Sequence, residues 1–362
     1  MNRFLKRALT VPAALIAVIS WMLILCSAAD HLAIGGPKAV WYGLDFVPAL
    51  WLLLLALIGA IALWLLGHRR IAMIGAFLSL GYFIAFGDLS AAPLGSLWSG
   101  GSSPGAILSV TALNVRYYSE GFREVMDAIR TMNADVVLLS ENTMDSTQVA
   151  ELRSLLPGYT YCPGHPNSTA ILSRLHILSF REIDLPSHEA SLSGGNDVAG
   201  MSSHPHRSFT HAQILFQGTP VNVVSIRFIA GRPKDHTWGE NVKWGRYLVE
   251  EQRAEVAAFT KYLAGLHGPI VFGGDLNAPP RSKTLKPLEA IAHDAYLSDH
   301  FWGDLTFRTE FPTLRLDYLF GMNGAVPVRS RVVRVVVSDH FPVSAEFRLE
   351  EQPERMVSQR TD

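Results

Sequence analysis

The stretch Pro269-Ile-Val-Phe-Gly-Gly-Asp-Leu-Asn-Ala-Pro-Pro280 decides the fold that we expect for this chain. Its first half is apolar and long enough for a buried strand. Asp275 and Asn277 are two residues apart, so a strand that continues to Asn277 turns both side chains to one face. The two prolines then end the strand, because neither has an N–H to donate. The stretch predicts a carboxylate and a carboxamide held at a strand end; the alternative is an ordinary Asx turn.

The same arrangement recurs along the chain, where short apolar runs end on polar side chains. The residues concerned are Asn114, Glu141, Asp275, Asn277, Asp339 and His340. Ligands of α/β domains bind at the loops just past strand ends, so we expect a site there. Carboxylate and amide oxygens suit Mg²⁺ or Mn²⁺ better than zinc. For Glu141 the alternative is a role as a helix N-cap partner.

Asp317 lies inside an apolar run, Arg-Leu-Asp-Tyr-Leu-Phe. A buried carboxylate is costly without a partner. We therefore expect Asp317 to meet a cation, a histidine or several N–H groups.

Residues 105–350 alternate β-rich runs with amphipathic helices. The β-rich runs are 106–115, 135–141, 168–174, 209–216, 221–228, 270–277, 316–320, 332–337 and 341–349, and the helical patterns cover 122–132, 149–156 and 247–266. Mixed strands with several helices predict an α/β sandwich of two packed sheets covered by helices.

The chain of 362 residues is 49% hydrophobic, and most of the excess lies before residue 95. Three apolar stretches, about 9–28, 42–66 and 71–89, predict a membrane region over residues 1–90, because a bilayer span needs about 20 apolar residues. The first stretch also has features of a cleaved signal peptide, but the longer stretch directly after it favours retained helices. Residues 91–104 are rich in glycine and serine and predict a flexible linker; residues 351–362 are expected to form a flexible tail.

Basic residues set the expected orientation of the three spans. Arg3, Lys6 and Arg7 precede the first span, and Arg69 and Arg70 separate the second from the third. The positive-inside rule places both clusters in the cytoplasm. The domain after residue 90 is then expected on the outer or periplasmic side of a bacterial-type inner membrane.

Two global features limit the function classes. The formal net charge of −1 gives no overall basic field of the kind that attracts nucleic acid. Cys162 is the single cysteine of the domain after residue 90, which excludes a thiolate zinc cage and an intradomain disulfide.

Six motifs stand in the order in which the endonuclease/exonuclease/phosphatase superfamily has them. They are Leu-Asn114-Val-Arg, Leu-Leu-Ser-Glu141-Asn, Ala-Ile-Leu-Ser-Arg174, Gly-Gly-Asp275-Leu-Asn277, Arg-Leu-Asp317-Tyr-Leu-Phe and Ser-Asp339-His340-Phe-Pro. Residues 107–348 thus resemble that superfamily, which includes deoxyribonucleases, abasic-site endonucleases, neutral sphingomyelinases and inositol polyphosphate 5-phosphatases. The resemblance implies a four-layer α/β/β/α sandwich and a phosphoesterase that uses Mg²⁺ or Mn²⁺ to hydrolyse phosphodiester or phosphomonoester bonds.

The resemblance also implies roles for single residues. Glu141 and Asn114 hold the divalent cation, with Asp339 near it. Asp275 and Asn277 orient the attacking water and the phosphate. His340, oriented by Asp317, acts as general base or phosphate clamp.

Two arginines complete the expected site. Arg207 lies in a region where many family members carry a phosphate-binding arginine, so we expect it to contact phosphate. Arg227 is a departure, because the family usually has a histidine at the end of this strand. Arginine cannot act as a general base, since its pKa is above about 12, but it can bind phosphate. We favour an active enzyme; the alternative is a catalytically impaired domain that binds a phosphorylated ligand.

The fold leaves the substrate open. Basic residues in the long connection 228–246 suit a nuclease, whereas Trp238 and Trp244 suit a membrane interface. A membrane tether favours a phospholipid head group and is equally compatible with an anchored nuclease. The expected partners are therefore a phosphodiester substrate, nucleic acid or phospholipid, and the lipid bilayer; no protein partner is predicted.

Overall fold

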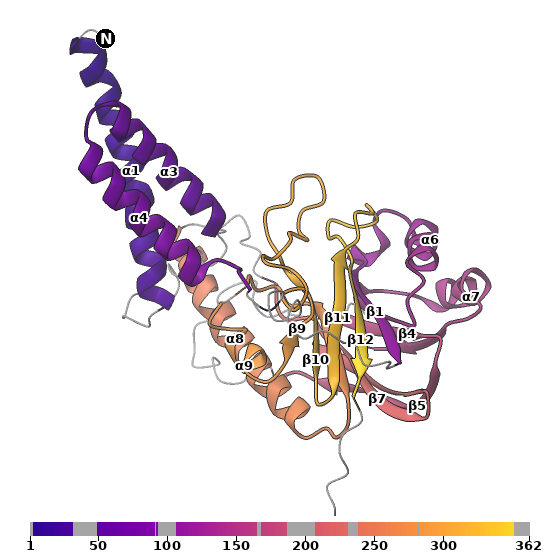
Figure 1. Ribbon diagram of the computed structural model, residues 1–362. Helices are drawn as coiled ribbons and strands as arrows, with labels where there is room; N and C mark the ends of the chain where they lie inside the picture. The colour runs from indigo at the N-terminus through magenta and orange to yellow at the C-terminus, as the bar shows by residue number, and fades with distance from the viewer. Residues whose placement is uncertain are drawn as a thin grey trace, which may run out of the picture.

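The computed structural model describes residues 3–31, 49–90, 92, 106–164, 168–186, 207–230, 238–280 and 282–350. Three apolar helices form a bundle that extends away from a domain of two β-sheets and flanking helices (Figure 1). The predicted tail, and the predicted linker apart from residue 92, lie outside the described residues.

Each sheet has six strands. The first has the order β11-β12-β1-β2-β4-β3, and the second has the order β5-β6-β7-β8-β10-β9. The strands of the first sheet are β1 (Ile107–Asn114), β2 (Val136–Asn142), β3 (Thr160–Pro163), β4 (Ser168–Ser173), β11 (Ala325–Val332) and β12 (Val343–Leu349). Those of the second are β5 (His176–Asp184), β6 (Ser208–Phe216), β7 (Thr219–Ser225), β8 (Ile270–Asp275), β9 (His293–Asp294) and β10 (Asp317–Met322).

Two parallel strand pairs lie at the centre of the sheets. They are β1–β2 in the first sheet and β7–β8 in the second, while the other pairs are antiparallel. Helix α6 (Phe122–Met132) connects β1 to β2, and α8 (Trp238–Ala264) lies between β7 and β8 along the chain. Parallel pairs end at the same sheet edge, so the polar residues that follow these strands are brought together.

Apolar clusters hold the layers together. One lies between the sheets and joins side chains such as Val110 of β1 and Val271 of β8. A second packs α8 onto the outer face of the second sheet, where the rings of Phe259 and Phe272 are 5.5 Å apart. A third packs α6 and α7 (Ser146–Leu155) onto the first sheet. The predicted sandwich of two sheets covered by helices is therefore confirmed.

The N-terminal helices are α1 (Arg3–His31), α3 (Ala49–Leu65) and α4 (Arg69–Phe86). They pack closely: a Cβ at Gly59 would lie 2.8 Å from Cα of Ala17, and Ser27 and Tyr82 share a hydrogen bond of 2.7 Å. Among the described residues, one helical segment, Leu9–Ala28, is long and apolar enough to cross a membrane by length and composition.

The prediction of three spans is thus met only in part. The apolar helix Ala49–Leu65 has 17 residues, about 25 Å at a rise of 1.5 Å per residue, which is short of a hydrocarbon core of about 30 Å. The first residues of the predicted span 42–66 lie outside the described range. Helix α4 begins with two arginines, which shortens its apolar part.

Arg315 connects the helical bundle to the domain. Its guanidinium binds Asp294 at 2.5 Å and Asp88, just past α4, at 3.0 Å. Burial lowers the pKa of Arg315, but Asp294 and Asp88 outweigh it and raise the pKa above its usual value. Backbone hydrogen bonds from Ser90 to Phe301 and from Gly303 to Asp88 complete the contact.

Candidate active site

Strands from both sheets deliver polar side chains to one place. Asn114 ends β1, Glu141 lies near the end of β2, and Asp275 ends β8. Strand β10 runs antiparallel to β8, so its first residue, Asp317, pairs with Asp275. The sequence therefore predicted correctly that these strand ends converge.

Asp275 is the most heavily bonded carboxylate of the site. Its Oδ2 accepts hydrogen bonds from Nδ2 of Asn114 at 2.9 Å and from Nδ2 of Asn277 at 3.1 Å, and its Oδ1 accepts one from the Asn277 backbone N–H. Burial, together with the nearby Asp317, raises the pKa of Asp275, although His340 and Arg227 counteract this. The contacts fix Asp275 with one oxygen toward the first sheet.

Glycine makes the approach between the strands of this site feasible. Gly274 has a φ of +138°, and a Cβ there would lie 2.1 Å from the carbonyl oxygen of Ile226. A side chain at this position is therefore excluded. Glu141 and Asn277 also have positive φ, 56° and 47°, which is strained for residues other than glycine and is typical of functional sites.

His340 and Asp317 form the expected pair. His340 Nδ1 lies 2.8 Å from Asp317 Oδ2, and both side chains are buried. Burial lowers the pKa of His340, but Asp317 and then Asp275 outweigh it and raise the pKa to about 9. Because Nδ1 is engaged by Asp317, Nε2 is the ring nitrogen left for a substrate or water.

Arg227, just past β7, lies among the acidic groups. Its Nη2 donates to Glu141 Oε1 at 2.6 Å, and its Nε is 3.9 Å from Asp275 Oδ2. Burial lowers the pKa of Arg227, but Glu141 and Asp275 together raise it by more than burial lowers it, so the net shift is upward. The arginine that replaces the usual family histidine is therefore part of the same charged cluster.

Asp339 lies beside a residue that the sequence analysis did not single out. Arg116 Nε is 3.5 Å from Asp339 Oδ2, and the Arg116 backbone N–H donates to Asn114 Oδ1 at 2.9 Å. Arg116 and the next two residues have positive φ. The signal was present, because Arg116 stands two residues after Asn114 in the first motif.

Thr306 was also missed, and it lies eleven residues before Asp317 in a stretch without a recognisable pattern. Its hydroxyl accepts hydrogen bonds from the backbone N–H groups of Leu316 at 3.0 Å and Asp317 at 3.3 Å. Its backbone carbonyl accepts from Phe341, next to His340. Thr306 thus connects the start of β10, which carries Asp317, to the segment before β12 that carries His340.

Arg207 makes its contacts elsewhere. Its guanidinium pairs with Glu251, at 2.8 Å, and with Glu255, both buried on α8. Glu255 also accepts a hydrogen bond from the Ile229 backbone N–H. Burial raises the pKa of Glu255 to about 7, although Arg207 counteracts it. Arg207 therefore ties α8 to the segment after Arg227, and its expected contact with phosphate stays a prediction.

The donors fit a divalent cation. Asp275, Asp317 and His340 bring one ligand atom each within 4.8 Å of one another, the one such group found among the described residues with this spacing. Carboxylate oxygens predominate, and the carboxylate of Glu141 and the amide of Asn114 are buried beside them. Such oxygen-rich sets suit Mg²⁺ and Mn²⁺.

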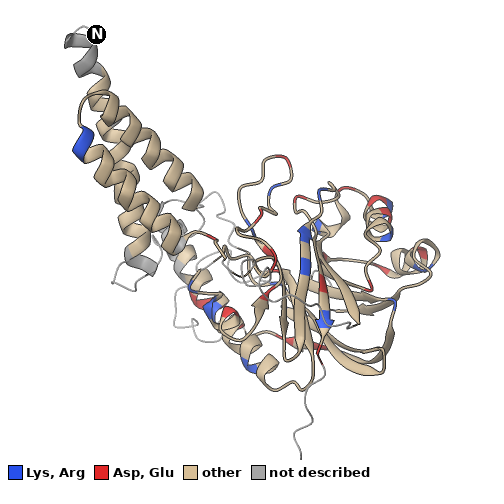
Figure 2. Ribbon diagram, in the orientation of Figure 1, with Lys and Arg blue, Asp and Glu red and all other residues tan. Residues whose placement is uncertain are grey.

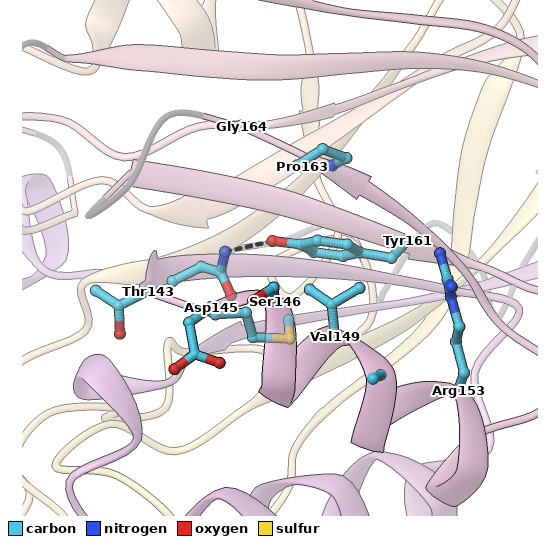
Figure 3. A pocket seen from close by; sticks show the side chains of 11 residues that line it. Thr143, Asp145, Ser146, Val149, Arg153, Tyr161, Pro163 and Gly164 are labelled. Carbon is cyan, nitrogen blue, oxygen red and sulfur yellow. Dashed lines mark hydrogen bonds between the residues drawn. The ribbon is translucent and has the colours of Figure 1, made fainter.

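A cavity of about 610 Å³ lies where β2 ends, between the segment 142–146 and residues of α7 and β3 (Figure 3). Its wall includes Asn142 and Tyr161, joined by a hydrogen bond of 2.9 Å, and Val149 and Arg153 of α7. The wall of the cavity offers both apolar and polar surface, and none of the residues of the acidic cluster lines it.

Comparison with known families agrees with this geometry. The model of the endonuclease/exonuclease/phosphatase family matches residues 111–340. The chain belongs to that family. The matched region contains the residues of the acidic cluster and the His–Asp pair, and the resemblance inferred from six motifs is confirmed.

Solved structures of family proteins have the same fold. A Bacteroides vulgatus endonuclease/exonuclease/phosphatase protein is 18% identical, with a TM-score of 0.50, over 68% of this chain and 100% of that chain. The D. rerio protein TDP2, solved with a single-strand DNA product, is 16% identical, with a TM-score of 0.51, over 67% of this chain and 99% of that chain. A Beutenbergia cavernae family protein is 20% identical, with a TM-score of 0.50, over 67% of this chain and 72% of that chain. No curated protein sequence matches the chain.

Proposed function

We propose that this chain is a phosphohydrolase that cleaves phosphodiester or phosphomonoester bonds with the aid of a divalent cation, Mg²⁺ or Mn²⁺. The observation that carries the proposal is the buried group formed by Asp275, Asp317 and His340, whose ligand atoms lie within 4.8 Å of one another. The close approach of Asp275 and Asp317 is unfavourable by itself, since like charges repel, and such a buried pair beside a histidine is typical of a functional site.

Each residue of the site has a separate role in the proposed reaction. Glu141 and Asn114, with Asp339 near them, would hold the cation, which would supply positive charge against the phosphate oxygens. Asn277 positions Asp275, because its Nδ2 donates to Asp275 Oδ2 and to the Phe228 carbonyl, and Asp275 orients the attacking water. His340 moves a proton at Nε2, because Asp317 holds Nδ1 at 2.8 Å and fixes the tautomer.

The helical bundle anchors the enzyme in a membrane. Most of the exposed large apolar side chains in the described part of the chain belong to α1, α3 and α4, for example Val11 at 71%, Leu65 at 75% and Phe77 at 77% exposure. Charged residues are concentrated on the domain and are scarce on the described parts of the helices (Figure 2). An apolar surface of this extent needs a lipid or protein cover.

The anchor has a defined expected orientation. The positive-inside rule places the N-terminus in the cytoplasm and, for three spans, the domain on the outer face. A reporter enzyme fused after residue 350 is therefore expected to be active only outside the cytoplasm, and cytoplasmic activity would refute this topology.

A phospholipid head group is the substrate that one further observation favours. Phe301, Trp302 and Phe311 are 46%, 67% and 65% exposed, and the ring of Phe311 lies 6.4 Å from that of Trp51 on α3. Exposed aromatic rings next to an apolar bundle suit a membrane interface. Nucleic acid remains the alternative, since the TDP2 structure holds a DNA product, and a binding domain disabled at Arg227 is the non-enzymatic alternative.

The test is hydrolysis by the full chain in detergent or lipid nanodiscs, with Mg²⁺ or Mn²⁺. Plasmid DNA, RNA, phospholipid vesicles and a small phosphomonoester are compared side by side. Asp275→Ala and His340→Ala are expected to abolish turnover, whereas Asp127→Ala on the exposed face of α6 leaves it unchanged. Activity that persists in both site variants, or that EDTA does not remove, would contradict the proposal.

A further inference from the structure

Arg227 lies between the two acidic parts of the active site. Its Nη2 is 2.6 Å from Glu141 Oε1, and its Nε is 3.9 Å from Asp275 Oδ2. The side chain is 16% exposed. A permanent positive charge is therefore present where the family's divalent cation is expected to bind.

The backbone holds Arg227 in this position. The N–H of Ile226 donates to Gly273 at 2.9 Å, and the N–H of Phe228 donates to Asp275 at 3.2 Å. The residues on either side of Arg227 are thus bonded to β8, and Phe228 is bonded again through its carbonyl, which accepts from Asn277 Nδ2. The guanidinium can shift only by rotation of its own side chain.

Glu141 contacts Arg227 and lies outside the most closely spaced acidic group of the site. The closely spaced group of Asp275, Asp317 and His340 does not include it, and its Oε1 is bound to the guanidinium. A cation that binds Glu141 must share the carboxylate with Arg227, and two positive charges a few ångströms apart repel each other.

One N–H of Arg227 donates no hydrogen bond to the described residues. Within the described residues, Nε of Arg227 is buried and has no hydrogen-bond partner. A buried donor without an acceptor is unfavourable, and a phosphate oxygen is an acceptor of the right charge. The guanidinium therefore uses Nη2 for Glu141, while its Nε lies 3.9 Å from Asp275 Oδ2, beyond hydrogen-bond distance.

We propose that Arg227 is a resident cation of this centre, which competes with the divalent cation for Glu141 and so weakens its binding. The inference rests on the proposed function, because it assumes that a divalent cation binds at this cluster. It adds that arginine at position 227 sets the cation affinity of the enzyme.

The test is calorimetric titration of the full chain in detergent with MnCl₂, which reads cation binding without any activity. Arg227→Gln is expected to bind Mn²⁺ at least tenfold more tightly than the unaltered chain. Arg174→Gln removes the same charge at the opposite end of β2, where Arg174 contacts Asn133, and is expected to stay within twofold. Arg227→Lys keeps the charge and is expected to stay within threefold.

Glu141→Gln tests the competition itself. In the unaltered chain it is expected to weaken Mn²⁺ binding by less than threefold, and in the Arg227→Gln background by more than tenfold. Equal losses in both backgrounds, or unchanged Mn²⁺ affinity in a folded Arg227→Gln chain, would overturn the inference. If the Arg227→Gln chain fails to fold, the Glu141→Gln variant of the otherwise unaltered chain decides. A fall in its Mn²⁺ affinity of more than tenfold then overturns the inference, and a smaller fall supports it. Hydrolysis assays decide the proposed function separately.

Discussion

The contact between Asp88 and Arg315 allows a quantitative prediction about how the helical bundle stabilises the domain. Asp88→Asn removes one negative charge from a pair that is 3.0 Å apart, with side chains 18% and 3% exposed. At an effective dielectric constant of about 20, charges about 4 Å apart attract by about 4 kcal/mol. Desolvation offsets part of this, and hydrogen bonds to charged groups contribute about 1.5–3 kcal/mol net. We expect the free energy of unfolding to fall by about 2 kcal/mol.

The assay is thermal unfolding of the full chain in detergent, followed by tryptophan fluorescence. For a domain of this size 1 kcal/mol corresponds to about 2–4 °C, so the unfolding temperature is expected to fall by about 4–8 °C. The matched control is Glu151→Gln, which breaks an ion pair with Arg123 of 2.6 Å whose arginine is 75% exposed. Exposed pairs contribute at most about 1 kcal/mol. Equal shifts in the two variants would refute the reasoning that burial makes the Asp88 contact strong.

Three further predictions concern the domain. Burial lowers the pKa of His211 to about 4, below its value of about 6.5 in the unfolded chain. The unfolded chain therefore takes up a proton more readily below pH 6.5, and the free energy of unfolding falls by about 3 kcal/mol between pH 6.5 and pH 4. Urea unfolding across this range should show a smaller fall in the His211→Gln variant. Asp317→Asn should lower kcat by at least about a hundredfold at unchanged far-UV circular dichroism, because it removes the group that fixes the imidazole; a loss below tenfold contradicts the pair's role. Gly274→Ala should lower the free energy of unfolding in urea by more than about 2 kcal/mol, because a Cβ would lie 2.1 Å from the Ile226 carbonyl oxygen. Gly158→Ala, where a Cβ would have no atom within 4 Å, should leave it unchanged.

The convergence of the active-site residues was predictable, because it depends on local signals. Each of Asn114, Glu141 and Asp275 ends an apolar run, and strand ends gather at one edge of a parallel pair. The cost of a buried carboxylate predicted that Asp317 would have a cation, a histidine or several N–H groups as partner, and the resemblance to the family selected His340. Chain order and residue chemistry were enough to predict that the strand ends converge, and the family motifs were needed to pair Asp317 with His340.

Arg207 shows where such reasoning stops. Its motif position predicts phosphate binding, but its partners, Glu251 and Glu255, lie 44 and 48 residues further along the chain. Nothing in the periodicity of α8 distinguishes these buried glutamates from the exposed glutamates that a surface helix normally carries. Which carboxylate an arginine meets is decided by tertiary packing.

Arg207 and Arg227 thus carry the same charge twenty positions apart in the chain and bind different acidic groups. The two glutamates of α8 neutralise Arg207 and, through the Ile229 N–H, fix the chain two residues after Arg227. Arg227 is thereby held at Glu141 from a rigid segment rather than from a free loop. A change at Glu255 should therefore alter the active site indirectly, by loosening the segment that positions Arg227, while the strand ends that carry Asp275 and Asp317 remain in place.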